Sequence, residues 1–275
     1  MNTTPAKVGK LAVVQGLLLM DRIAPKVGIP ILYYHRVSPN IGREHVHSIY
    51  PEEFEWQMRW LAERGYRVIG LDEVVDCLDR GATDKCVALT FDDGHRDILR
   101  YAAPILRRYS ARATVFVVSA YVGRRGWLTA DGGFSESGPG IQRWELLSWD
   151  ELKQGASVFD LGVHGKTHRP LTALSDAEIA SELDEARNTI LRQTGVHARF
   201  YCYPYGLADE RTAAAVRRAG FRGACGTEHG LNTPENDRFL LCRNQVGQGL
   251  REAQFSLLMT EYVRTYRRMG RWLRR

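Results

Sequence analysis

Short apolar runs alternate with amphipathic, helix-like segments along most of this chain, and that alternation limits what it can fold into. The apolar runs are expected to form strands at residues 29–35, 66–69, 87–91, 113–118, 159–163, 199–203, 222–225 and 239–242. Helices are expected between them, at residues 51–65, 71–78, 98–109, 149–152, 175–193 and 210–219, with Pro104 moving the start of the third helix toward itself. This order favours parallel βαβ units, in an α/β barrel or a doubly wound sheet.

The apolar run at 87–91 stops at two adjacent carboxylates, Asp92 and Asp93, and Gly94 follows. Successive side chains of a strand point to opposite faces, so the two aspartates have different surroundings while the strand is extended. Where the glycine bends the chain, both can reach one site from different directions. One carboxylate would then hold a cation while the other takes a proton from water. The alternative is an ordinary solvated Asp-Asp-Gly turn.

Two histidines, His164 and His168, stand four residues apart just after the predicted strand at 159–163. In a parallel barrel the carboxyl ends of the strands meet at one rim. We therefore expect Asp93, His164 and His168 to form a three-ligand site with open positions. Two imidazoles, one carboxylate and an exchangeable water suit Zn²⁺ or a similar divalent ion.

The segments Thr90-Phe91-Asp92-Asp93-Gly94, His164-x-x-x-His168 and Tyr203-Pro204-Tyr205-Gly206 occur in this order along the chain. Residues 29–246 thereby resemble the polysaccharide deacetylase (NodB-homology) family, carbohydrate esterase family 4. The resemblance implies an α/β fold, a distorted (β/α)7 barrel, here with flanking N- and C-terminal helices. It also implies a metal-dependent hydrolase that removes acetyl groups from N-acetylated sugars.

The resemblance assigns roles to individual residues. Asp93, His164 and His168 would hold the metal, most simply Zn²⁺, and Asp92 would be the general base. The backbone N–H of Tyr205 would contribute to the oxyanion hole.

The late strand of the family that ends in Leu-x-His has no counterpart here, because Leu241-Cys242-Arg243-Asn244 contains no histidine. Leu32-Tyr33-Tyr34-His35 is similar to that strand moved to the front, as in the circularly permuted exopolysaccharide N-deacetylases. His35 would then be the general acid that protonates the leaving amine. Its alternative is a histidine at the end of a core strand.

Two further positions depart from the family pattern. Gly165 follows the first histidine where the family often has Ser or Thr, and Thr167 is the nearby candidate to replace that hydroxyl. Cys202 stands where the family has an arginine two residues before the proline. Arg243 is the candidate to orient Asp92 in its place. These departures keep two alternatives open, a glycan O-deacetylase and a catalytically impaired carbohydrate-binding relative.

The net charge of +6 is concentrated near the C-terminus, where seven arginines and two glutamates follow from Arg251 onward. The remainder is close to neutral, which argues against a nucleic-acid-binding core. We divide the chain into an N-terminal amphipathic segment (1–27), a deacetylase barrel (28–250) and a basic amphipathic C-terminal helix (251–275). The expected partner is an acetylated glycan. The C-terminal helix is expected to pack on the barrel, and the alternatives are contact with an anionic membrane surface, made together with the N-terminal segment, or binding of a partner.

Residues 11–20 are apolar but too few to span a bilayer. They resemble the core of a signal peptide, yet no small-x-small cleavage site follows. We expect an uncleaved helix on the domain or on a membrane surface, with an export signal as the alternative. Five widely spaced cysteines without a Cys-x-x-Cys pair indicate free thiols, which favours a cytoplasmic protein peripheral to the inner membrane.

Two further expectations concern loops. Residues 121–143 carry six glycines and no periodicity, so a long structureless loop is expected there. His45 and His47 follow His35 and are candidates for lining the cleft, whereas His95 is expected to be a surface or loop residue.

Overall fold

The computed structural model describes residues 5–40, 47–82, 85–128, 134–136 and 144–272. Its centre is a parallel sheet with strand order β12-β11-β10-β6-β5-β1-β13, and β4 also pairs with β5. These strands are β1 (Ile31–Tyr34), β4 (Arg67–Ile69), β5 (Cys86–Phe91), β6 (Ala113–Val117), β10 (Phe159–Val163), β11 (Phe200–Cys202), β12 (Gly223–Cys225) and β13 (Asn244–Gln245).

Residues 241–245 close this sheet into a barrel. Leu241 forms a parallel bridge to Cys225 of β12, and Asn244 then pairs with Leu32 of β1. The two edges of the sheet are thus joined by one segment, which confirms the predicted distorted (β/α)7 barrel. The last strand was expected at 239–242, which is wrong. The backbone of Leu241 bonds to Ala224 of β12 and to Gly226, and the chain pairs with β1 only from Asn244 onward.

Strand β5 lies at the centre of the distortion. Its Ala88 pairs with both β1 and β4, whereas its Phe91 pairs with both β1 and β6. Because a strand has only two edges, β4 and β6 share one edge of β5 at its two halves. All six residues of β5 are buried, as expected for a parallel strand covered on both faces.

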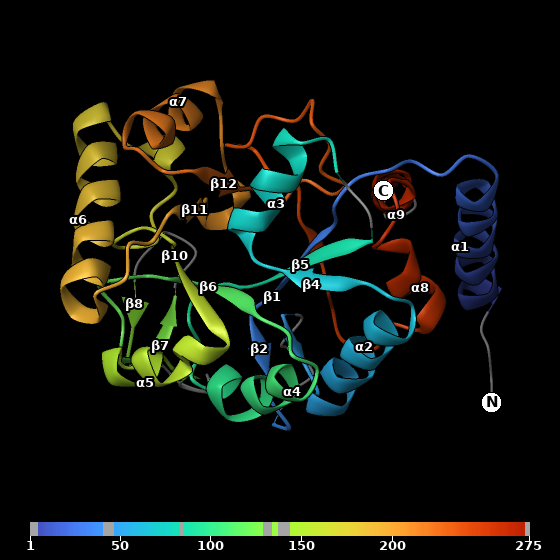
Figure 1. Cartoon of the computed structure of the whole chain (residues 1–275), viewed down its shortest axis with the longest axis horizontal. Coiled ribbons are helices and arrows are strands. Elements are labelled where there is room, and N and C mark those ends of the chain that lie inside the picture. The colour runs from blue at the N-terminus through green and yellow to red at the C-terminus, as the bar shows by residue number, and fades with distance from the viewer. Residues whose placement is uncertain (1–4, 41–46, 83–84, 129–133, 137–143, 273–275) are drawn as a thin grey trace.

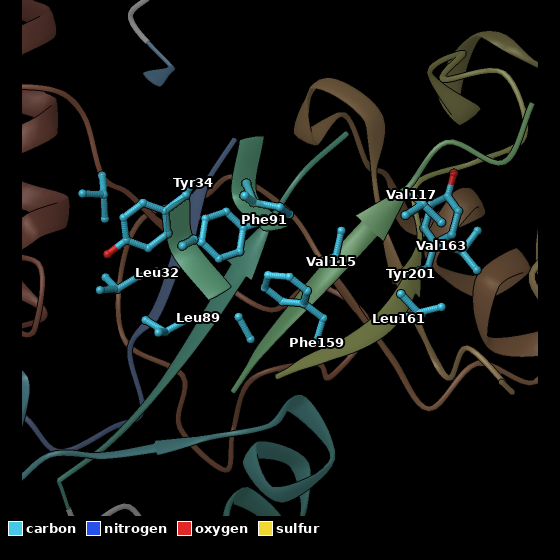
Figure 2. Packing of buried hydrophobic residues seen from close by; sticks show 14 of the residues in the cluster. Leu32, Tyr34, Leu89, Phe91, Val115, Val117, Phe159, Leu161, Val163 and Tyr201 are labelled. Carbon is cyan, nitrogen blue, oxygen red and sulfur yellow. The ribbon is translucent and has the colours of Figure 1, made fainter. Parts of the chain in front are cut away.

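The main hydrophobic core fills the space that the curled sheet encloses (Figure 2). Figure 2 shows side chains from neighbouring strands converging there, among them Leu32, Leu89, Val115 and Leu161. Burial of such side chains contributes about 1.5–3 kcal/mol each and holds the strand ends in register.

Helices surround the barrel (Figure 1). They are α2 (Pro51–Glu63), α3 (Leu71–Asp79), α4 (Ala103–Arg108), α5 (Trp149–Gln154), α6 (Asp176–Thr194) and α7 (Glu210–Arg218), with short turns η1 (Ile98–Ala102), η2 (Gly155–Ser157), η3 (Leu171–Ala173) and η4 (Pro204–Gly206). Ser175 and Glu178 form a capping box at the start of α6, and Gly195 ends it in the left-handed conformation. Pro104 lies in the first turn of α4, so the helix does begin beside the proline.

Three helices form a flanking layer on one side of the barrel: α1 (Pro5–Ile23), α8 (Glu252–Leu257) and α9 (Tyr262–Trp272). Val14 and Leu17 of α1 pack against Leu257 of α8. The C-terminal segment was expected to be a single helix, which is wrong. The chain turns at 258–261, where Thr260 Oγ1 donates to the carbonyl of Leu257. No described helix is both long and apolar enough to cross a bilayer.

The glycine-rich stretch 121–143 is not structureless. Strand β7 (Arg125–Leu128) pairs antiparallel with β8 (Phe134–Ser135) and with β9 (Trp144–Glu145), while 129–133 and 137–143 lie outside the described residues. A bridge from Leu146 to His95 ties this small sheet to the loop after β5. A two-stranded unit, β2 (Arg36–Val37) with β3 (Ser48–Ile49), follows β1.

Candidate metal and catalytic site

The candidate site lies at the barrel rim formed by the carboxyl ends of β1, β5, β10 and β11. Tyr34 of β1 is in register with Phe91 of β5, so His35 and Asp92 follow at the same level. The N–H of Asp92 donates to the carbonyl of Tyr34 at 2.9 Å. His164 comes directly after β10 in the same way. The predicted site residues are therefore delivered to one rim by strand pairing.

Asp93, His164 and His168 come together as predicted. Asp93 Oδ1 lies 3.6 Å from Nε2 of His164 and 3.6 Å from Nε2 of His168. One ligand atom from each residue falls within 4.8 Å of the others. Asp93 Oδ1 is buried and has no hydrogen-bond partner within the described part of the chain. A buried carboxylate oxygen facing two imidazole nitrogens fits a divalent cation, and the N₂O donor set suits Zn²⁺.

The backbone is left-handed at several of these positions. The φ angles are 69° at Asp93, 64° at His168 and 59° at Tyr205, and the glycines 94 and 165 are left-handed as well. A non-glycine residue in this region costs free energy, on the order of 1–3 kcal/mol. Such residues are held by their surroundings and cluster at functional sites. Here they turn the chain sharply after each strand and direct the side chains to one point.

Hydrogen bonds at the far side of each imidazole fix its orientation. His164 Nδ1 donates to the carbonyl of Cys202 at 2.8 Å, which leaves Nε2 as the lone-pair nitrogen. His168 Nδ1 is 3.2 Å from the hydroxyl of Tyr205. Burial, and then the neighbouring His164, lower the pKa of His168 to about 4. A neutral His168 is ready to bind a cation without releasing a proton.

His95 belongs to this site, although the sequence indicated only a surface or loop residue. Its side chain is buried, and its Nε2 lies 3.5 Å from Asp93 Oδ2. Burial alone would raise the pKa of the Asp93 carboxyl, but His95 and the neighbouring His35 and His168 hold that pKa well below its usual range. The sequence feature that could have placed His95 at this site is its position directly after Asp-Asp-Gly.

Arg243 orients Asp92, as the sequence suggested. Its Nη1 and Nη2 donate to Asp92 Oδ1 at 2.7 Å and Oδ2 at 2.8 Å, a bidentate pair in which Arg243 is 0% exposed. Burial would raise the pKa of Asp92, but the charge and hydrogen bonds of Arg243 outweigh it, so this pKa is lowered. Asp92 is therefore a fixed carboxylate.

The arginine is itself held from several sides. Its Nε donates to the carbonyl of Gly226 at 2.8 Å, and Nη1 donates to Thr90 Oγ1 at 3.1 Å. Nη2 also lies 3.0 Å from Cys202 Sγ, and the guanidinium sits 4.6 Å from the ring centroid of Tyr33. Cys202 thus occupies the family's arginine position without supplying its charge, and Arg243 supplies that charge from the segment that closes the barrel.

A second donor set, Asp92, His164 and Cys202, also lies within ligand distance. It is a poorer cation site. Both oxygens of Asp92 are already bound to Arg243, and burial holds the pKa of the Cys202 thiol well above its usual value.

Glu182 of α6 holds the turn that carries the two histidines, a role that no sequence pattern indicated. Its buried carboxylate accepts the N–H groups of Lys166 at 2.7 Å and Thr167 at 3.0 Å, as well as the Thr167 hydroxyl. Thr167 therefore serves the turn and not the cation position. A Cβ at Gly165, which has φ 81°, would lie 3.2 Å from Glu182 Oε2, so glycine suits this position.

His35 and Tyr205 border the site. Burial lowers the pKa of His35 to about 4, although Asp93 and Asp92 oppose this. The His35 ring packs against the ring of His47, with centroids 4.6 Å apart; His45 lies outside the described residues. Tyr205 is 41% exposed, and its ring meets that of His168 edge-on.

Comparison with known proteins places this geometry in a family. The sequence model described as "Polysaccharide deacetylase" matches residues 79–224. The Bacillus subtilis protein YxkH is 27% identical, over 82% of this chain and 74% of that protein. The Staphylococcus aureus poly-beta-1,6-N-acetyl-D-glucosamine N-deacetylase is 24% identical, over 77% of this chain and 71% of that enzyme.

Solved structures share the fold. The Streptococcus pyogenes deacetylase PplD, in complex with acetate, superposes with a TM-score of 0.72 at 23% identity, covering 86% of this chain and 99% of that one. IcaB from Ammonifex degensii gives a TM-score of 0.69 at 24% identity, covering 85% and 96%. Because the family model spans more than half of the chain, this protein belongs to the polysaccharide deacetylase family of hydrolases.

Proposed function

We propose that this protein is a metal-dependent N-deacetylase of an acetylated glycan, with the metal held by Asp93, His164 and His168. The observation that carries the proposal is the buried, unpartnered Oδ1 of Asp93 facing two imidazole Nε2 atoms at 3.6 Å. A divalent ion at this position, most simply Zn²⁺, lowers the pKa of a bound water and polarises the acetyl carbonyl.

Asp92 is the proposed general base. It directly precedes Asp93, so it would lie beside a water held by the proposed ion, and Arg243 fixes both of its oxygens. A positioned base of this kind contributes on the order of 10²–10⁴ in rate. The lowered pKa keeps the carboxylate ready to accept a proton at neutral pH.

His35 is the proposed general acid, and the backbone N–H of Tyr205 the proposed oxyanion donor. Strand pairing sets His35 next to Asp92 at the same rim. Because burial lowers its pKa to about 4, His35 is neutral in the resting site at neutral pH, and it must take up a proton during the reaction before it can pass one to the leaving amine nitrogen. Tyr205 follows β11 and reaches the site beside His168. An oxyanion donor there would contribute about 3–4 kcal/mol to transition-state stabilisation.

The N-acetyl specificity is inferred from relatives. The S. aureus relative is a poly-beta-1,6-N-acetyl-D-glucosamine N-deacetylase. An O-acetyl ester would present the same carbonyl to the same residues, so O-deacetylation is the second candidate. A binding-only relative is disfavoured, since Arg243 and Glu182 fulfil the needs that the Cys202 and Gly165 departures had left open.

The test is acetate release by the purified protein from a β-1,6-linked N-acetylglucosamine oligomer and from an O-acetylated glycan. The zinc-loaded protein should release acetate from the N-acetylated oligomer, lose activity with a chelator and regain it with Zn²⁺. Release only from the O-acetylated glycan would replace the proposal with its second candidate. Stoichiometric zinc without release from either substrate would contradict both.

A further inference from the structure

The outward side of α1 is apolar although it faces away from the barrel. Leu19 is 57% exposed, Met20 52%, Ile23 76% and, just beyond the helix, Val27 65%. The exposed residues between positions 11 and 23 include a single charged one, Arg22. They are Leu11, Ala12, Gln15, Gly16, Leu19, Met20, Arg22 and Ile23. A surface helix ordinarily turns charged residues to solvent. This face therefore has the composition of a binding surface.

The other side of α1 is already occupied. Val14 and Leu17 are buried against Leu257, and Tyr262 and Tyr266 of α9 pack on the same cluster. Figure 1 shows α1 at the edge of the molecule, outside α8 and α9 and at the opposite end from α6. Thus α1 is anchored to the protein by one face and offers the other to something outside it.

Charge indicates what that partner is. Residues 1–27 carry four basic residues and one acidic, and residues 251–275 carry seven and two. These two flanking segments hold a net charge of +8, while residues 28–250 hold −2. Arg22 and Lys26 alternate with Ile23 and Val27 along the chain, and all four are exposed. The layer that exposes apolar side chains is thus also the positive part of the protein.

We propose that the outer face of α1 docks on an anionic membrane surface. Leu19, Met20, Ile23 and Val27 enter the boundary between headgroups and acyl chains, and the exposed Arg22 and Lys26 beside them face the anionic headgroups. A second copy of this chain is a poorer partner, because pairing two such layers would bring like charges together. The proposal does not depend on the catalytic roles given above.

The test is co-sedimentation of the full chain with vesicles of phosphatidylcholine alone or mixed with phosphatidylglycerol. Wild type should bind the mixed vesicles, and its affinity for pure phosphatidylcholine should be at most about a tenth of that value. Its affinity for the mixed vesicles should fall as salt is raised. The Leu19→Glu/Ile23→Glu variant should bind the mixed vesicles about a hundredfold more weakly. Both side chains are exposed, so thermal unfolding followed by circular dichroism should be unchanged.

The matched control is Val196→Glu/Leu240→Glu, which places two charges at exposed apolar positions outside the flanking layer. It should bind like wild type. Equal weakening by both double variants, equal binding to the two kinds of vesicle, or no binding at all would overturn the proposal. So would a wild-type dimer in light scattering that Leu19→Glu/Ile23→Glu converts to a monomer without changing vesicle binding.

Discussion

Asp92 and Asp93 are neighbours in the chain but lie in two differently built pockets. Both oxygens of Asp92 are bound by Arg243, and its side chain is buried. Asp93 keeps one buried oxygen without a partner, opposite the Nε2 atoms of His164 and His168. Arg243 satisfies both oxygens of Asp92. Oδ1 of Asp93 has no hydrogen-bond partner in the described part of the chain, and the proposed cation would fill that position.

The backbone draws the same distinction. Asp93 and His168 have left-handed φ angles, while Asp92, which directly follows β5, does not, and its N–H bonds to Tyr34 of β1. One pocket holds its residues in strained conformations that a ligand can stabilise, and the other holds an ion pair by packing. Substitutions in the two pockets should therefore fail in different ways.

The largest effect is expected for His164→Ala, which removes a ligand from the Asp93 pocket. Deacetylation should fall by about 10⁴-fold or more, because the ion would no longer be held where it polarises the carbonyl. Zinc content measured by atomic emission should fall with it. Retention of stoichiometric zinc with normal acetate release would show that the cation lies elsewhere.

Asp92→Asn should separate the pockets, since it changes the base and leaves the three ligands intact. Acetate release should fall by about 10³-fold while zinc remains bound, because the amide cannot take up the proton. Zinc content and activity are measured on the same preparation. Loss of zinc together with activity would mean that the two pockets are one coupled unit.

Much of the site was predictable from the sequence, because parallel strand pairing largely determines where its residues lie. Runs that end in Asp92-Asp93, His164 and His35 reach one rim whenever the sheet is parallel, so their types and positions sufficed for the family, the barrel and the three-ligand cluster. The α6 capping box and the Pro104 boundary are local signals and were also predicted correctly.

Contacts between segments that are distant in the sequence could not be predicted in this way. Glu182 lies on a helix where an acidic residue is ordinary, and only the fold reveals that it accepts two backbone N–H groups of the His164 turn. His95 was expected to be a surface or loop residue, and a position in a loop does not by itself indicate whether a side chain is buried. The β7–β8–β9 sheet was missed since its strands pair across a long gap with no periodic pattern.

A smaller effect is expected for Arg243→Met, which leaves the Asp92 carboxylate buried without its partner. Unpairing a buried charge costs about 3–5 kcal/mol, so the free energy of unfolding measured in urea should drop by that order. The double variant Arg243→Met/Asp92→Asn should regain part of this loss, because the uncompensated charge is gone. Equal stability of the single and double variants would show that the ion pair is not what stabilises this pocket.

The smallest effect, and the sharpest comparison, is expected for Glu182→Gln, which touches neither pocket directly. Glu182 accepts the N–H groups of Lys166 and Thr167 and so holds the turn between the two histidines. A glutamine there turns an N–H group toward donors, so the His168 side of the Asp93 pocket should loosen, with about tenfold weaker zinc affinity. Activity at saturating zinc should stay near wild type.

Glu185→Gln is the matched control, because Glu185 on the same helix bonds the Lys166 side chain and not the turn's backbone. Equal zinc affinities for the two variants in a chelator competition would show that the turn is held without Glu182. The strain at His168 would then be sustained by the barrel alone.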